Sequence, residues 1–198
     1  MTNGSVLLSQ KKYARTVLAR FQEFLPGKSN VPMDPTDGSK LSATMGPTTR
    51  EGKAIMANLP YRQLLGSLMY LMVSTRPDVA LAISRLSRFS QNPGMVHWRA
   101  ALKIVAYVHT TQDVGMLYRR NAPVHLVGVT DAGFAGDPDE RRSQGGYLYL
   151  LGGAAVSWKS YWISTVARST PEAKYVAASD CAAEGIFLRS FLGELGFP

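Results

Sequence analysis

Asp131 is the residue of this sequence best suited to hold a cation. It lies at the end of a β-prone run in the segment VTDAGFAGD. The small residues Ala132 and Gly133 follow it, so we expect its carboxylate to be accessible at a strand end. Carboxylate oxygens are hard ligands that suit hard cations such as Mg²⁺. The alternative interpretation is a turn aspartate that closes a strand and binds nothing.

Glu172 and Lys174 lie two residues apart in the segment EAKYVAAS. Thr170 and Pro171 precede them and predict the start of a helix, with Thr170 as its cap. Residues two apart on a helix are separated by roughly 200° around the axis, so these two side chains are expected on nearly opposite sides. A glutamate in the first turn is also favoured by the helix dipole, which gives Glu172 a purely structural explanation.

Three basic side chains near these residues are candidates for phosphate binding. Arg141 and Arg142 follow an acidic loop, and Lys159 follows Val-Ser-Trp. Local ion pairs with Asp139 and Glu140 are an equally good explanation for the presence of the two arginines. For Lys159, a local structural role is as well supported as phosphate binding. A zinc site is not expected, because no Cys or acidic partner stands at metal-ligand spacing from the histidines His97, His109 and His125.

Helices are expected in the first part of the chain. Segment 9–25 predicts an amphipathic helix, begun by Ser9 and ended before Gly27, because apolar side chains recur every four residues: Tyr13, Val17, Phe21 and Leu25. Segment 28–58 is rich in Ser, Thr, Gly and Pro without periodicity and predicts an extended connection. Further helices are expected over 60–74, 77–89 and 97–111.

Strands are expected after these helices. Short β-prone runs cover 115–118, 125–130, 146–151 and 154–158. The pair Gly152-Gly153 supplies the positive φ values of a tight hairpin turn. A closing helix from 170 to about 195 would pack on the sheet, so the order of elements predicts an α+β fold.

Composition limits the class of protein. The chain has 198 residues, of which 45% are hydrophobic, so we expect a globular protein with a core. Its single cysteine, Cys181, and the absence of a secretory signal pattern predict an intracellular rather than a secreted protein. The longest apolar run, 64–73, is too short to span a bilayer, so no membrane is expected. The formal net charge of +8 favours a polyanionic partner.

Several phrases, taken in their order along the chain, resemble the Pol polyprotein of copia-type retrotransposons. They are YRQLLGSLMYLMVSTRPDVALAISRLSRFSQNP, HWRAALKIVAYVHTT, TDAGFAGD, RRSQGGYLYLLGGAAVSWKS and STPEAKYVAASDCAAE. The likeness covers essentially the whole chain. It implies a reverse transcriptase thumb-like helix over 1–27, a linker over 28–58, a helical connection region over 59–120 and a truncated domain similar to ribonuclease H over 121–198. The last would be a partial mixed sheet with one packed helix.

The resemblance also implies a chemistry. Ribonuclease H cleaves the RNA strand of an RNA/DNA hybrid with two Mg²⁺ ions held by acidic side chains. The family's first carboxylate corresponds to Asp131, and its second corresponds to Lys174, for which Glu172 is a poor substitute. The third belongs to a strand beyond Pro198. We therefore expect an inactive enzyme that could still bind the hybrid through Arg141, Arg142, Lys159 and Lys174. The chain also lacks the Tyr-X-Asp-Asp sequence of the polymerase site.

Two other functions remain open from the sequence. The chain could be a non-catalytic module that a host uses to bind nucleic acid or protein, or a decayed transposon remnant without activity. The strand missing after Pro198 would leave an unpaired sheet edge beside Asp131, through which copies of the chain could associate.

Overall fold

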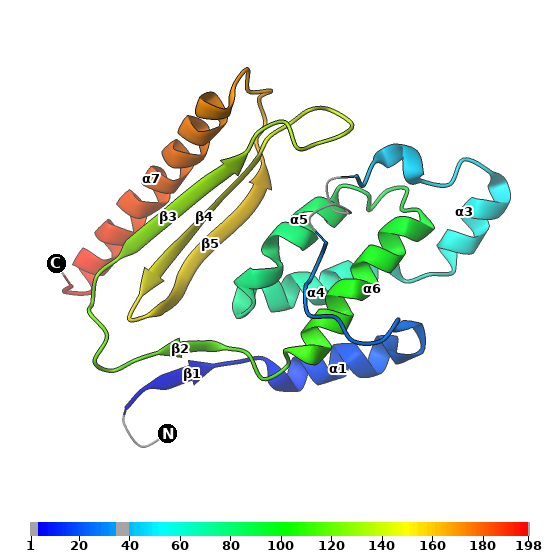
Figure 1. Ribbon diagram of the computed structural model, residues 1–198. Helices are drawn as coiled ribbons and strands as arrows, with labels where there is room; N and C mark the ends of the chain where they lie inside the picture. Colours follow the sequence, from blue (N-terminus) through cyan, green and yellow to red (C-terminus); the bar gives the residue numbers. More distant parts are fainter. Residues whose placement is uncertain (1–3, 35–39, 198) are drawn as a thin grey trace. The chain divides into compact units, whose positions relative to one another are not determined.

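The chain forms two compact units of different secondary structure. A computed structural model describes residues 4–34 and 40–197. Helices build the unit Leu8–Gly115, and the second unit, 4–7 together with 116–197, contains a three-stranded sheet and a long helix (Figure 1). The fold is α+β, as predicted. The four-part division expected from the resemblance stays a prediction.

The first helix, α1 (Lys11–Phe21), follows the predicted apolar stripe and continues as the short helix η1 (Gln22–Phe24). Its buried side chains are Ala14, Val17 and Phe21. The helix begins after Gln10, which makes no capping hydrogen bond through its side chain. The prediction that Ser9 caps this helix is therefore wrong.

The segment 28–58 is less extended than predicted. It contains the short helices η2 (Ala43–Met45) and α3 (Arg50–Ala57), while residues 35–39 lie outside the described part of the chain. The Thr49 side chain begins α3 by accepting a hydrogen bond from the Gly52 amide. Sequence periodicity missed α3 because the helix is only eight residues long and buries Met56 alone.

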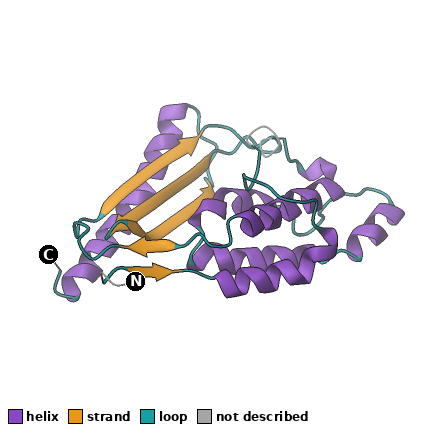
Figure 2. Ribbon diagram, turned by 60° about the horizontal axis from the view of Figure 1, so that its bottom comes forward, coloured by secondary structure: helices purple, strands orange, loops and turns teal. Residues whose placement is uncertain are grey.

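The three helical stretches predicted next are confirmed. They form α4 (Tyr61–Ser74), η3 (Pro77–Val79) with α5 (Ala80–Ser87), and α6 (Met95–Thr110), drawn as purple ribbons in Figure 2. Their apolar faces meet those of α1 in one core. The most deeply buried side chains of that core include Phe21, Leu64, Leu68, Ile83, Leu86 and Ile104.

A buried ion pair lies beside this core. The Arg76 guanidinium, only 3% exposed, donates to both oxygens of Asp78 at distances of 2.8 to 3.2 Å. It also donates to the carbonyl and the hydroxyl oxygen of Thr111, at 3.2 and 2.6 Å. The Tyr107 hydroxyl donates to Asp78 at 2.9 Å. Arg76 thus joins the start of η3 to the end of α6, and these contacts give Asp78 a structural role.

The sheet of the second unit has the strand order β3 (Val127–Gly133), β4 (Gln144–Leu151), β5 (Ala154–Trp162). β4 and β5 form the predicted hairpin, and Gly152 and Gly153 have φ of +61° and +85° in its turn. Both pairings are antiparallel, which differs from the mixed sheet that we expected. Short connections pair successive strands antiparallel, whereas a parallel pair requires a long crossover.

A two-stranded sheet precedes this one. β1 (Val6–Leu8) pairs with β2 (Met116–Tyr118), which lies close to β5. Met116 packs with Ala154 and Ala155 in a small buried cluster. The Tyr118 hydroxyl donates to the Ala155 carbonyl at 2.6 Å, which ties β2 to β5.

The long helix α7 (Thr170–Glu194) lies along the sheet (Figure 1). Its buried residues, Ala173, Ala177 and Cys181, recur every four positions and form the stripe that faces the strands. The side chain of Ser169 accepts from the Glu172 amide and caps the helix, so the prediction of Thr170 as the cap is wrong by one residue.

One aromatic ring fixes the distance between α7 and the sheet. The Tyr149 hydroxyl donates to the Cys181 carbonyl at 2.6 Å. A Cβ at Gly128 would lie 2.5 Å from the Tyr149 ring, and one at Gly185 would lie 2.4 Å from its hydroxyl oxygen. Glycine at these two positions therefore makes room for the ring between β3 and α7. Burial raises the pKa of Tyr149 to about 12, so its hydroxyl stays protonated as the donor.

Candidate functional site: Asp131 and the basic residues around it

Asp131 lies near the end of β3 with its side chain 79% exposed. The register places it opposite Gly146 of β4, which has no side chain to cover it. Thr130 donates through its hydroxyl to the Gly146 carbonyl at 2.9 Å and holds the strand end in place. Ala132, the next residue, is buried against α7. The expected accessible carboxylate at a strand end is present.

The structure brings Lys174, from the first turns of α7, to this carboxylate. The Lys174 Nζ lies 3.1 Å from the Asp131 Oδ1. The hydrogen bond from Lys174, a backbone hydrogen bond from Ala132 and the lysine charge hold the pKa of Asp131 below its usual value. Both side chains are more than half exposed, so solvent screening keeps the contribution of this pair to stability small.

Glu172 has a structural role instead. Its carboxylate accepts a hydrogen bond from the Arg168 amide at 2.6 Å, while its own amide donates to the Ser169 hydroxyl oxygen at 3.3 Å. This reciprocal arrangement satisfies amides at the start of the helix. The alternative that Glu172 is a helix-start acid is the one that its contacts support.

The Mg²⁺ ions that the resemblance implies do not fit this arrangement. In residues 4–34 and 40–197, no three His, Cys, Asp or Glu side chains gather as metal ligands. The one carboxylate available, Asp131, already faces an ammonium group at 3.1 Å. A cation approaching Asp131 would meet a like charge at close range, and Coulomb repulsion opposes its binding.

The other basic candidates lie on neighbouring elements of the same unit. The Arg142 Nε lies 2.7 Å from the Glu140 Oε2, so this arginine makes the local ion pair considered from the sequence. Arg141 is exposed and occupies a turn with φ of +58°. The Lys159 Nζ lies 4.5 Å from the centre of the Tyr161 ring in a cation–π contact. The side chains of Arg141 and Lys159 are both accessible to phosphate groups of a bound partner.

A polar cluster between α7 and the strands was missed by sequence reasoning. The Ser157 hydroxyl of β5 donates to the Glu184 carboxylate at 2.6 Å. Burial, and to a lesser degree the negative charge of Asp180, raises the pKa of Tyr161. Asp180 and Glu184 stand four residues apart, and this spacing on a predicted helix was the signal that could have placed both on one face.

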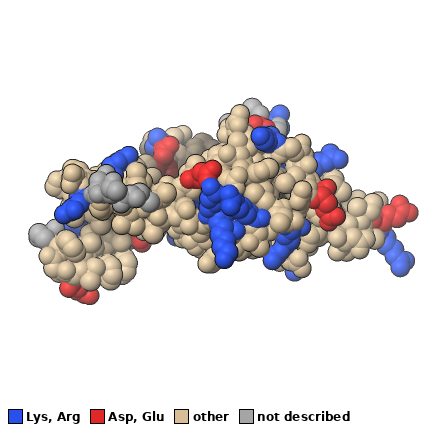
Figure 3. Space-filling view, turned by 90° about the horizontal axis from the view of Figure 1, so that it is seen from below, with Lys and Arg blue, Asp and Glu red and all other residues tan. Residues whose placement is uncertain are grey.

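A second basic surface, also missed, lies on α1 of the helical unit. Lys and Arg side chains gather on the face shown in Figure 3. Lys11, Lys12 and Arg15 line a shallow depression along α1. Lys11 is paired with Asp113, and the Arg15 Nε donates to the Gln112 side chain at 3.2 Å. Lys12 and Arg15 are both exposed to solvent.

Replacing Lys174 with Met tests the ion pair directly. Without the ammonium, the pKa of Asp131 should rise toward its ordinary value, as read from the side-chain carboxyl ¹³C shift during an NMR pH titration. A carboxyl with a lowered pKa stabilises the fold above its unfolded pKa and loses that effect as the pH falls through its folded pKa. The small stability difference between the wild type and Lys174→Met should therefore vanish in acid. Lys159→Met should leave Asp131 unchanged, and an unaltered titration in Lys174→Met would refute the pairing.

Among the helices of the described residues, none combines the length and apolar character that crossing a bilayer requires.

Comparison with known proteins found relatives over nearly the whole chain. The retrovirus-related Pol polyprotein from transposon TNT 1-94 of Nicotiana tabacum is 45% identical over 195 residues, which are 98% of this chain and 14% of that protein. The corresponding polyprotein from transposon RE2 of Arabidopsis thaliana is 33% identical over 96% of this chain and 12% of its own length. This chain thus spans about one eighth of these polyproteins.

A shorter relative matches along almost all of its own length. The secreted RxLR effector protein 161 of Plasmopara viticola is 44% identical over 133 residues, which are 67% of this chain and 94% of that protein. No family model matches the chain. No solved structure matches it.

Proposed function

We propose that this chain, which belongs to the family of retrovirus-related Pol polyproteins of transposons, is a nucleic-acid-binding segment of such a polyprotein that does not cleave RNA. The unit that contains α7 would correspond to part of a ribonuclease H domain. The helical unit would correspond to the thumb and connection region of a reverse transcriptase. The expected partner is an RNA/DNA hybrid.

The observation that carries this proposal is the position of Lys174. Its ammonium lies 3.1 Å from the Asp131 carboxylate, where cleavage by two metal ions would need a second acidic side chain. Glu172 cannot supply that ligand, because its carboxylate accepts the Arg168 amide at the helix start. The residues present support phosphate binding without metal-dependent hydrolysis.

The phosphate contacts are proposed for Arg141, Arg142, Lys159 and Lys174. Arg141 and Lys159 are exposed, and the Lys174 side chain is 57% exposed. A basic side chain that neutralises a phosphate releases condensed counterions, so affinity should fall steeply as salt increases. The net charge of +8 supports the same partner class.

The test uses the full chain and a labelled RNA/DNA hybrid. With Mg²⁺ present, no RNA cleavage is expected, and turnover that disappears in Asp131→Asn would contradict the proposal. Binding should weaken between about 50 and about 200 mM salt. The double variant Arg141→Gln/Arg142→Gln should bind less tightly and lower the salt slope by about 2. The matched control Arg50→Gln/Lys53→Gln removes the same charge from α3 and should bind as the wild type does.

A second candidate function is a protein-interaction module. It is favoured by the match to an effector protein over 94% of that protein's length, because a sequence similar to 67% of this chain occurs there as a short protein. In this case the open side of β3, an edge strand, would pair with another copy or another protein. Dimers in analytical ultracentrifugation, combined with no hybrid binding at low salt, would favour this function over the first. The effector is named as secreted, whereas we expect this chain inside a cell.

A further inference from the structure

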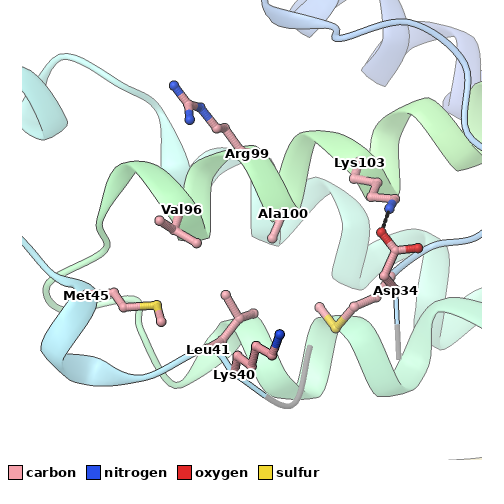
Figure 4. Close-up of a pocket in the computed structure, with 9 residues that line it drawn as sticks. Asp34, Lys40, Leu41, Met45, Val96, Arg99, Ala100 and Lys103 are labelled. Carbon is pink, nitrogen blue, oxygen red and sulfur yellow. Dashed lines mark hydrogen bonds and ion pairs between the residues drawn. The ribbon is translucent and has the colours of Figure 1, made fainter. Parts of the chain in front are cut away.

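The helical unit contains a cavity of about 380 Å³, with α6 on one side and the described residues Met33, Asp34, Lys40, Leu41 and Met45 on the other. From α6, Val96 and Ala100 point into this space (Figure 4). Leu41 and Met45 face them from the other side. The volume falls within the range of about 300 to 1,000 Å³ that is common for small-molecule sites. The cavity lies far along the chain from Asp131 and takes no part in the function proposed above.

Close contacts lie at both ends of the cavity. At one end, Gly94 approaches the chain so closely that a Cβ there would lie 2.0 Å from the Met45 carbonyl oxygen. At the other end, the Lys103 ammonium is paired with the Asp34 carboxylate. Leu41, which is 5% exposed, packs in the helical core between these contacts. Contacts within the chain therefore position Leu41, Met45 and the facing residues of α6.

The lining combines apolar walls with one cation that extends into the space. Met33, Leu41, Met45, Val96 and Ala100 provide the apolar surface. The Lys40 side chain lies beside Leu41 with its ammonium directed into the space below α6, whereas Arg99 points away from it (Figure 4). The Asp34 carboxylate at the cavity end is already occupied by Lys103. A ligand that fits this lining has an apolar body and one negative charge.

We propose that this cavity binds an amphipathic monocarboxylate, a molecule with an aliphatic chain and a single carboxylate head. The chain lies between Val96, Ala100 and the side chains of Leu41 and Met45. The head group pairs with the Lys40 ammonium. Burial of the apolar chain provides most of the affinity, and the charge-assisted hydrogen bond selects an acid over an uncharged molecule of the same length.

The test uses decanoate below its micelle concentration, with decanol as the uncharged probe. In the wild-type chain labelled with ¹³C at methionine methyl groups, saturable NMR shift changes are expected at Met33 and Met45. Met116, which belongs to the other unit, should not shift. Decanoate should bind more tightly than decanol. This measurement needs no variant, and the absence of changes at Met33 and Met45 would overturn the proposal.

Variants then separate the head-group contact from the apolar cavity. Lys40→Gln should weaken decanoate binding about tenfold and leave decanol binding unchanged, because a hydrogen bond to a charged group is lost. Ala100→Phe should fill the space and abolish binding of both probes. Lys12→Gln removes the same charge from α1 and should change nothing. Equal binding of decanoate and decanol, or equal loss in Lys40→Gln and Lys12→Gln, would contradict the assigned head-group site.

Discussion

Replacement of Arg76 with Met should lower the free energy of unfolding of the helical unit by about 3 kcal/mol. Arg76 is 3% exposed and donates to Asp78 and to both oxygens of Thr111. Methionine has a comparable length but no donors, so the variant leaves the Asp78 carboxylate without its cation and removes both hydrogen bonds from Arg76 to Thr111. Urea unfolding followed by far-UV circular dichroism, which reports the helices, measures the loss.

Two comparisons make this result specific. Arg20→Met removes an exposed arginine from α1 and should cost less than about 0.5 kcal/mol. Arg76→Lys keeps the charge but cannot reproduce the forked contacts to Asp78 and Thr111, so it should be intermediate. A loss below about 1 kcal/mol in Arg76→Met would show that the network adds little to the stability of the fold.

Replacement of Lys174 with Glu should strengthen divalent-cation binding at Asp131. The change removes an ammonium 3.1 Å from Asp131 and puts a second carboxylate beside it. For a divalent ion, this two-unit change in charge favours binding by about ten- to a hundredfold, after allowance for solvent screening. Paramagnetic broadening of the Asp131 and Ala132 amide signals by Mn²⁺ measures the gain at the residue concerned.

Lys159→Glu is the matched control, because it makes the same change of charge on β5 of the same sheet. It should not broaden the signals of Asp131. Equal broadening in both variants would show a general effect of net charge, and Lys174 would then not be the group that excludes the metal.

Local patterns predicted the elements of this fold well, because each depends on residues near one another in sequence. The four-residue recurrence of apolar side chains predicted α1, and the pair Gly152-Gly153 predicted the turn between β4 and β5. The relation between Lys174 and Glu172 was likewise predictable. Helical periodicity alone separates them, and in the structure the first faces Asp131 while the second caps the helix start.

Contacts between distant segments could not be predicted in this way. Arg76 donates a hydrogen bond to Thr111, which lies 35 residues away in sequence, and no local sequence pattern predicts this contact. The hydrogen bond from Ser157 to Glu184 joins a strand to a helix and depends on how the two pack. The cavity beside α6 also escaped notice, because segment 28–58 has no periodicity that would place Leu41 and Met45 against a helix.

The position of the Tyr149 ring between Gly128 and Gly185 limits which substitutions these three positions can accept during evolution. A side chain at either glycine would collide with the ring, and a smaller residue at 149 would leave a void and remove the hydrogen bond from the Tyr149 hydroxyl to the Cys181 carbonyl. Substitution at one of the three positions is therefore tolerated only together with change at the others. In an alignment of relatives, these positions should covary as a triplet although they lie on two strands and a helix.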